Sequence, residues 1–141
     1  MLKDKDLLNF LDIAIKESIK ALNANEVPIG SIVVCNKSKK VISKAFNMTE
    51  KLGDPTAHAE IIAIQKAVKK IGDWRLDNYS LFTTIEPCNM CMEVIKAARI
   101  KKIYYGSKNT SKIKLKKKPE QISLESDFCK KILKDFFRKK R

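Results

Sequence analysis

Apolar residues near the start of the chain recur at intervals of three and four positions, which places them on one stripe of a helix over residues 6–23. The members of this stripe are Leu8, Leu11, Ile15, Ile19 and Leu22. The pattern then changes to a β-branched run over residues 29–35, which is typical of a buried strand. After a polar turn, residues 41–46 predict its antiparallel hairpin partner, and residues 47–57 predict a loop.

Two further helices are predicted in the middle of the chain. One runs from about His58 to Lys70, with Gly72 as its terminator. The other follows Pro87, because proline suits the first position of a helix, where no N–H partner is needed. The short apolar runs at residues 81–85 and 102–106 predict strands on either side of this second helix.

The last part of the chain is harder to assign to regular elements. Residues 107–121 are rich in lysine and poor in apolar side chains, which predicts a loop or a short strand. A final helix, capped by Ser123 or Ser126, is predicted to reach Phe137. We expect four apolar residues of this helix to face inward, namely Phe128, Ile132, Leu133 and Phe136.

The order of the predicted elements indicates an α/β fold. Strands that alternate with helices favour right-handed crossovers and a mixed sheet covered on both faces, so we expect a three-layer α/β/α arrangement with about five strands. With 141 residues, no internal repeat and no linker, the chain is expected to form one domain over residues 1–141.

Charge is distributed unevenly along the chain, which carries a formal net charge of +14. Residues 1–98 hold 14 basic and 12 acidic residues, whereas residues 99–141 hold 16 basic and 4 acidic ones. An excess of this size suggests an anionic partner, either nucleic acid or a membrane surface, bound by the last third of the chain. The aromatic residues expected to face inward on the final helix argue against the membrane surface.

The chain shows no sign of membrane insertion or export. No apolar run approaches the roughly 20 residues that span a bilayer, and the first residues lack the apolar core of a signal peptide. We therefore expect a cytoplasmic, reducing location, where paired cysteines more often bind metal or carry out redox chemistry than form structural cross-links.

A compact set of metal-binding side chains stands at the two predicted helix starts. Cys88 and Cys91 are three positions apart, and a helix N-terminus favours the thiolates that metals require. His58 is the only histidine in the chain, so it is the only imidazole that can join them. Structural zinc normally takes four protein ligands, whereas catalytic zinc takes three and leaves one position for water. A redox role for the Cys-x-x-Cys pair is the alternative.

Glu60 lies two positions beyond His58, so the two side chains do not share a helix face. We expect Glu60 to act as a general acid–base over a metal-activated water rather than as a fourth ligand. The remaining cysteines, Cys35 and Cys129, lie in apolar surroundings and are expected to be core residues.

These motifs, His-Ala-Glu at 58–60 and Pro-Cys-Asn-Met-Cys at 87–91, resemble those of the zinc-dependent cytidine/deoxycytidylate deaminase superfamily. Within it, the chain is most similar to the bacterial tRNA-specific adenosine deaminases. This resemblance covers nearly the whole chain, and it includes residues 26–30, 54–61 and 84–91 and the tail at 135–138. It implies the cytidine-deaminase-like fold.

The resemblance also implies a set of roles for individual residues. His58, Cys88 and Cys91 would bind one Zn²⁺ per subunit, and Glu60 would shuttle protons. Contacts with the target nucleotide or the anticodon loop are implied for a further group, namely Val27, Asn47, Ala59, Asp135, Phe136, Phe137 and Arg138. The implied reaction is hydrolysis of adenosine to inosine at the wobble position of a tRNA anticodon stem-loop, carried out by a homodimer with no nucleotide cofactor.

The chain departs from the family pattern within its basic C-terminal segment, residues 107–141. Residues 107–121 contain no histidine, and Asn109 stands where the family commonly has an acidic residue. Attraction of phosphates is expected instead from Lys112, Lys114, Lys116, Lys117 and Lys118.

Two other functions fit part of the sequence. A small-molecule deaminase of cytosine, guanine or adenosine fits the zinc motifs, but such a substrate has no need of the basic segment. A non-catalytic, zinc-stabilised RNA-binding module fits the charge, but the open ligand position and Glu60 argue against it.

Overall fold

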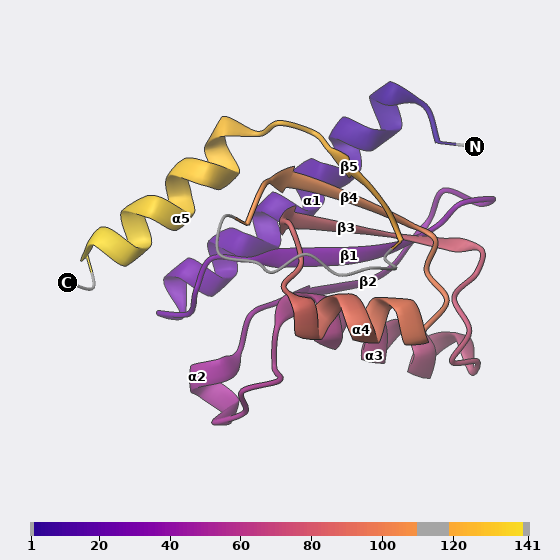
Figure 1. The fold of residues 1–141 in the computed structure, drawn as a ribbon, viewed down its shortest axis with the longest axis horizontal. Helices are drawn as coiled ribbons and strands as arrows, with labels where there is room; N and C mark the ends of the chain where they lie inside the picture. Colours follow the sequence, from indigo (N-terminus) through magenta and orange to yellow (C-terminus); the bar gives the residue numbers. More distant parts are fainter. Residues whose placement is uncertain (1, 110–118, 140–141) are drawn as a thin grey trace.

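A mixed five-stranded sheet forms the centre of the fold in the computed structural model, which describes residues 2–109 and 119–139 (Figure 1). The strands are β1 (Gly30–Cys35), β2 (Val41–Phe46), β3 (Tyr79–Ile85), β4 (Lys102–Ser107) and β5 (Glu120–Ser123), in the spatial order β2-β1-β3-β4-β5. β1 is antiparallel to both β2 and β3, whereas β3, β4 and β5 run parallel. The predicted hairpin and the mixed sheet are confirmed.

Helices cover both faces of this sheet, which confirms the predicted three layers (Figure 1). They are α1 (Asp4–Asn23), α2 (Thr49–Leu52), α3 (Ala59–Ile71), α4 (Asn89–Ala97) and α5 (Asp127–Lys139). α3 and α4 pack on one face over a large apolar cluster, and α1 packs on the other face around Phe10, Phe82 and Tyr104. α5 lies on the α1 side, where the two helices line a common groove. No helix in the described ranges combines the length and apolar character needed to cross a bilayer.

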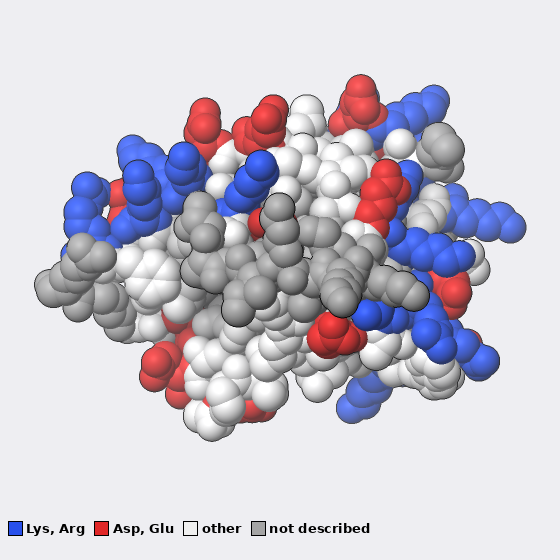
Figure 2. Space-filling view, viewed as in Figure 1, with Lys and Arg blue, Asp and Glu red and all other residues white. Residues whose placement is uncertain are grey.

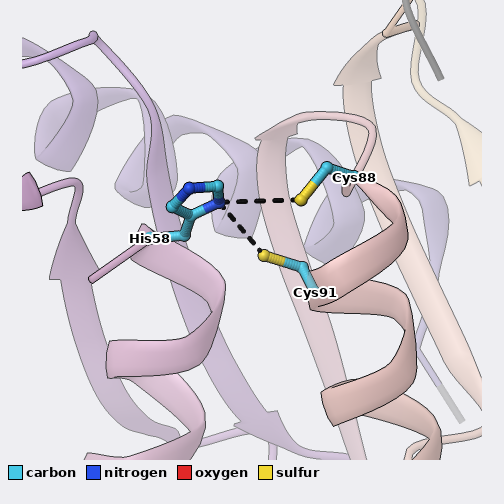
Figure 3. Close-up of side chains that lie close together, drawn as sticks. All are labelled: His58, Cys88 and Cys91. Atoms are coloured by element: carbon cyan, nitrogen blue, oxygen red, sulfur yellow. Dashed lines mark hydrogen bonds between the residues drawn. The ribbon is translucent and has the colours of Figure 1, made fainter. Parts of the chain in front are cut away.

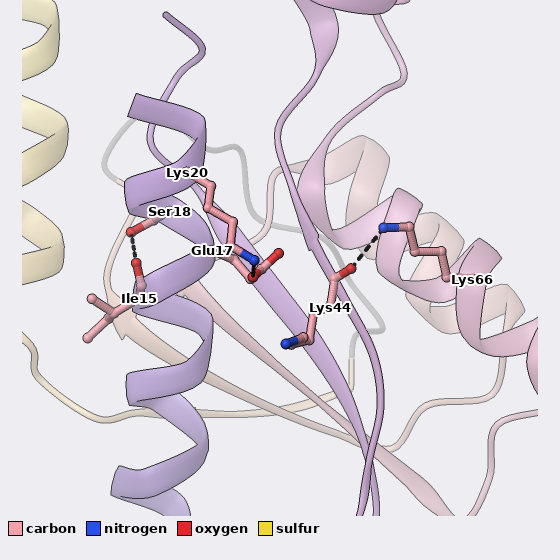
Figure 4. Close-up of polar contacts among 6 residues, drawn as sticks. All are labelled: Ile15, Glu17, Ser18, Lys20, Lys44 and Lys66. Atoms are coloured by element: carbon pink, nitrogen blue, oxygen red, sulfur yellow. Dashed lines mark hydrogen bonds and ion pairs between the residues drawn. The ribbon is translucent and has the colours of Figure 1, made fainter. Parts of the chain in front are cut away.

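α1 rests very closely on β1. A Cβ atom at Gly30 would collide with the backbone of Ala14 and Ser18 and with Cβ of Glu17, so only glycine fits at this position. Glu17 is buried on this side of α1, and its Oε2 pairs with Lys20 Nζ at 2.6 Å (Figure 4). Across the molecule, Lys66 Nζ of α3 donates to the backbone oxygen of Lys44 in β2 at 3.0 Å (Figure 4).

The predicted helices and strands are found with small shifts at their ends. α1 begins at Asp4, two residues earlier than predicted, because the Asp6 carboxylate accepts the Lys3 backbone N–H at 3.0 Å. α3 ends at Ile71, one residue later than predicted, and the predicted terminator Gly72 follows it in the left-handed conformation at φ 80°. The predicted loop at residues 47–57 contains the short helix α2, which its sequence pattern does not indicate.

The C-terminal part differs from the prediction in one important respect. α5 begins at Asp127, and the Ser126 hydroxyl accepts the backbone N–H of Cys129 at 3.3 Å, so Ser126 is the residue that caps it. The expectation that Phe128 faces inward is wrong, because this side chain is 48% exposed. Cys129, one position further, is the buried residue of α5 and packs against Gly106 of β4.

β5, a parallel edge strand beside β4, overlaps only the last two residues of the segment 107–121 that was predicted to be a loop or a short strand. The lysines of this segment that were expected to attract phosphates lie outside the described residues; they are Lys112, Lys114, Lys116, Lys117 and Lys118.

Candidate active site

Two helices begin side by side at the edge of the sheet where β3 ends. His58 is the N-cap of α3 and Cys88 is the N-cap of α4, and both residues have extended backbone conformations. Neither helix has a side-chain cap, so their first N–H groups and dipoles face the same small region. This arrangement favours negative charge at the point where the two helix starts meet.

The side chains of His58, Cys88 and Cys91 converge in this region (Figure 3). His58 Nδ1 lies 3.6 Å from Cys88 Sγ and 3.4 Å from Cys91 Sγ. All three potential ligand atoms lie within 4.8 Å of one another, and in the described ranges no other group of His, Cys, Asp and Glu does so. The structure therefore brings together the three residues predicted to bind metal.

His58, Cys88 and Cys91 lie within hydrogen-bonding distance of one another, and this favours a thiolate at Cys88. The pKa of Cys88 is lowered to about 4, chiefly because the Cys91 thiol donates to its sulfur and next because His58 does. The same interaction with Cys88, together with burial, raises the pKa of Cys91, and contact with Cys88 raises the pKa of His58. Two sulfurs and one imidazole nitrogen form a donor set that suits a zinc-like ion, so the residues present fit a metal.

Cys35 is far from this donor set. In the register of β1 and β3 it pairs with Tyr79, at the end of β3 opposite to Ile85. Six residue-to-residue steps along the strand separate these two ends of β3, which amounts to about 20 Å. Cys35 is half-buried rather than fully enclosed, whereas Cys129 is a core residue at 1% exposure, as expected.

Glu60 lies in the first turn of α3, beside but outside the metal-binding group. Its side chain is buried, and its Oε1 has no hydrogen-bond partner in the part of the chain that the structure describes. Burial raises the pKa of Glu60 from an ordinary 4.5 to about 7. A carboxyl group with this pKa can exchange a proton near neutral pH, as general acid–base catalysis requires.

Asn47, immediately after β2, is held next to the His58 segment. Its side chain is buried, and its Nδ2 donates to Glu26 Oε1 and to Thr49 Oγ1, both at 3.3 Å. The next residue, Met48, donates its backbone N–H to the oxygen of Ala57 at 2.9 Å. These contacts fix Asn47 in the segment that leads from β2 to His58, and its predicted contact with the target nucleotide stays a prediction.

Glu26 was not among the predicted site residues. It is 1% exposed and lies in the connection between α1 and β1. Its neighbour Val27, which was predicted to contact substrate, is half-buried in the same connection, and Ala59 is fully buried at the start of α3. A single acidic residue directly before the apolar Val27-Pro28-Ile29 run was the sequence signal that could have indicated Glu26.

The tail residues are divided between two cavities. Asp135 and Phe136 line a groove of about 660 Å³ between α1 and α5, which includes none of the metal-binding residues. Asp135, Phe137 and Arg138 line a second cavity of about 490 Å³, where α5 meets the ends of β3 and β4. This second cavity includes Ile85, the last residue of β3 and three positions before Cys88 in the sequence, but none of the metal-binding residues.

The second cavity is basic. Its cationic side chains are Lys108, Lys130, Lys134 and Arg138, and Arg138 is paired with Asp135 at 2.5 Å. Lysine and arginine side chains also gather over α5 in the space-filling view (Figure 2). Asn109, which follows β4, donates its backbone N–H to Glu86 Oε1 at 3.1 Å.

The fold and this site define a deaminase. Residues 6–141 match the MafB19-like deaminases, and the chain belongs to this family. It is 37% identical over 147 residues to the tRNA-specific adenosine deaminase of Buchnera aphidicola subsp. Schizaphis graminum, a match that covers 94% of each protein.

Other relatives match over a shorter stretch. The tRNA-specific adenosine deaminase of Rickettsia bellii is 39% identical over 97 residues, which cover 69% of this chain and 67% of that protein. The relative from Aquifex aeolicus is 41% identical over 98 residues, which cover 70% of this chain and 64% of that protein. Part of each of these two relatives therefore lies outside the match.

Two solved deaminase structures also resemble this chain. The chain resembles a tRNA:A34 deaminase with a TM-score of 0.82 and 33% identity, over 89% of this chain and 99% of that one. It also resembles guanine deaminase from Bacillus subtilis with a TM-score of 0.69 and 34% identity, over 77% of this chain and 67% of that one.

Proposed function

We propose that this protein hydrolyses adenosine to inosine at the wobble position of a tRNA anticodon. The observation that carries the proposal is the convergence of His58, Cys88 and Cys91 beside the buried carboxyl group of Glu60. The choice of tRNA as substrate is supported by the full-length similarity to a tRNA-specific adenosine deaminase and to the structure of a tRNA:A34 deaminase.

The proposed cofactor is one Zn²⁺ per chain, held by His58 Nδ1, Cys88 Sγ and Cys91 Sγ. When bound, it supplies the Lewis acidity that makes water a nucleophile near neutral pH. The α4 helix start stabilises the Cys88 thiolate, and burial of Cys91 keeps bulk water from competing for that ligand position.

Glu60 carries the proton transfers in this proposal. Its raised pKa of about 7 allows it to take a proton from the attacking water and to release that proton to the adenine ring nitrogen. Glu60 then takes the proton of the new hydroxyl group at C6 and passes it to the exocyclic amine, so the C6–N bond breaks, ammonia leaves and Glu60 returns to its starting state. The unpartnered Oε1 supports this role, because no protein group has to be displaced before the carboxyl group reacts.

The remaining predicted residues are proposed to hold the RNA. Val27, Asn47 and Ala59 would contact the target nucleotide, and the tail from Asp135 through Phe136 and Phe137 to Arg138 would contact the anticodon loop. A loop nucleotide is already unpaired, so its extrusion into the site costs less than opening a duplex. We further propose that the chain is one domain that acts as a cytoplasmic homodimer, with its basic C-terminal segment on the RNA.

The similarity to Bacillus subtilis guanine deaminase favours a second candidate, a nucleobase deaminase. One assay separates the two functions. The zinc-loaded protein is incubated with an anticodon stem-loop that has adenosine at the wobble position, and in parallel with free adenosine, guanine and cytosine. Inosine in the stem-loop, detected as an A-to-G change on sequencing, supports RNA editing, whereas turnover of a free base alone supports the second candidate.

A further inference from the structure

We infer that Glu26 is a positioning residue that orients Asn47 and fixes the segment between β2 and the metal-binding His58. This inference rests on the proposed function, because it assigns Glu26 a role through the residue proposed to contact the target nucleotide. It concerns a residue outside the metal-binding group and outside the proton-transfer step.

The Glu26 carboxylate is buried and uses both of its oxygens as acceptors. Oε1 accepts from Asn47 Nδ2 at 3.3 Å and from the backbone N–H of Glu50 at 3.0 Å, and Oε2 accepts from the backbone N–H of Lys51 at 2.7 Å. The residue itself is anchored at the end of α1, where its backbone N–H donates to Ala21 oxygen at 2.9 Å. A charge at 1% exposure is therefore compensated by three donors, all from the segment that follows β2.

The short helix α2 depends on this carboxylate. Met48, its N-cap, has no side chain that can accept the free N–H groups of the first turn, and α2 buries none of its residues. An isolated helix of one turn is unstable in water, so its conformation must come from contacts outside it. Glu26 supplies the missing cap from 24 positions away in the sequence, at the end of the helix where a negative charge is favoured.

Asn47 is oriented by the same contact. Both hydrogens of its side-chain amide are directed to acceptors, one to Glu26 and one to Thr49. This leaves Oδ1 as the amide atom that can accept a hydrogen bond from a nucleotide. The backbone N–H of Asn47 donates to Ile29 oxygen at 3.1 Å, so the residue is fixed at both its main chain and its side chain.

The requirement for two acceptors explains why a carboxylate stands here. In Glu26→Gln, whichever way the amide turns, its NH₂ group faces a backbone N–H, because Oε1 and Oε2 each accept one. The substitution keeps the size of the side chain and the rest of the site, so it perturbs the orientation of Asn47 and α2 without opening a cavity.

The matched control is Glu17→Gln. Glu17 is also a buried glutamate, at 4% exposure, but it lies on α1 and pairs with Lys20. We expect Glu26→Gln to lower kcat/KM for the stem-loop by about tenfold or more, since it leaves a buried donor unpaired beside Asn47. Zinc content should match that of the wild type, and Glu17→Gln should keep activity within about twofold of the wild type.

A double-mutant cycle with Asn47→Ala shows whether Glu26 acts through Asn47. If it does, Glu26→Gln adds less than about twofold to the loss already caused by Asn47→Ala, because the two changes remove one interaction. Equal losses in both backgrounds, or no loss in the single variant, would overturn the inference.

A second measurement keeps the test independent of the proposed function. The Asn47 side-chain NH₂ and the Glu50 and Lys51 amides are followed by NMR in the zinc-loaded protein. We expect Glu26→Gln to shift all three signals and to speed their hydrogen exchange, with no such change in Glu17→Gln. Unchanged signals overturn the role of Glu26. If the wild-type protein is inactive on the stem-loop and Glu26→Gln still produces these NMR changes, only the proposed substrate is refuted.

Discussion

His58 Nδ1 lies 3.4 Å from Cys91 Sγ, although 33 positions separate the two residues in the sequence. The two residues belong to the starts of α3 and α4, which pack on the same face of the sheet. The donor set is therefore positioned by the packing of two helices and not by one flexible loop. A site built on such elements holds its ligands in a fixed geometry before a metal arrives.

Loss of one ligand should release the metal and destabilise the protein. We expect Cys91→Ser to lower bound zinc far below one ion per chain, and to abolish the rise in Tm that added zinc gives the wild type. Stabilisation by a ligand at 1,000 times its Kd amounts to about 4.1 kcal/mol, so the effect is measurable by thermal melting. Cys35→Ser is the control, and loss of zinc from that variant too would contradict the assigned ligand set.

Removal of the Glu60 carboxylate should stop the reaction and leave the metal bound. We expect Glu60→Gln to lower kcat for inosine formation by about 10²–10⁴-fold, the usual contribution of a general acid–base. Metal content, measured by mass spectrometry, should not change, because Glu60 lies outside the donor set. Glu93→Gln, on the exposed side of α4, is the matched control and should keep wild-type activity.

The pH dependence of stability should report the buried carboxyl group in metal-free protein. Since burial raises the pKa of Glu60 from 4.5 to about 7, the folded chain keeps a proton that the unfolded chain loses in this range. The folded state binds more protons, so the contribution of Glu60 to stability falls as pH rises, by about 3 kcal/mol in total.

Glu60→Gln cannot titrate, so it isolates this contribution from that of the neighbouring thiols. We expect the variant to gain stability relative to the wild type as pH rises from 4.5 to 7, and the difference to level off above that range. Urea unfolding in the presence of a chelator measures the difference. A difference that does not vary with pH would show that Glu60 is not desolvated in the folded protein.

The four cysteines should react with an alkylating agent in a defined order. Contact with the Ser38 hydroxyl lowers the pKa of the half-buried Cys35, whereas burial raises the pKa of Cys129. In zinc-loaded protein we expect Cys35 to react first and Cys129 last, as judged by peptide mass spectrometry. A chelator should add rapid modification of Cys88, whose pKa is lowered to about 4.

The basic cavity between α5 and the ends of β3 and β4 should contribute to RNA affinity through charge. We expect Lys134→Gln to weaken binding of the stem-loop and to lower the slope of log K against log salt by about 0.7–0.9, the effect of one phosphate contact. The kcat at saturating RNA should not change. Lys69→Gln, at the far end of α3, is the control, and equal slopes for the two variants would remove Lys134 from the RNA contact surface.

The larger elements of this fold could be predicted because each has a local pattern. The stripe of α1, the β-branched run of β1 and the Gly72 terminator of α3 depend on periodicity or on backbone conformation, and the structure contains all three. The metal-binding group was predictable for another reason. With one histidine in the chain, there was only one imidazole to combine with Cys88 and Cys91.

The features that were missed depend on contacts between distant segments. α2 has no apolar stripe of its own, and it forms where Glu26 caps it from another part of the chain. Phe128 and Cys129 are neighbours on an amphipathic helix, and only the position of α5 against β4 decides which of them is buried. Local sequence carries no information about either contact.

The direct contact of α1 with β1 at Gly30 has a consequence at the edge of the sheet. No side chain separates the backbones there, so the helix has one permitted height above the strand. The last turn of the same helix contains Ala21, whose backbone oxygen accepts the N–H of Glu26, and the Glu26 carboxylate in turn accepts the first N–H groups of α2. The absence of a side chain at Gly30 therefore determines the distance between α1 and β1. A steric contact on one face of the sheet is in this way connected, through α1 and Ala21, to the polar groups that Glu26 holds at its edge.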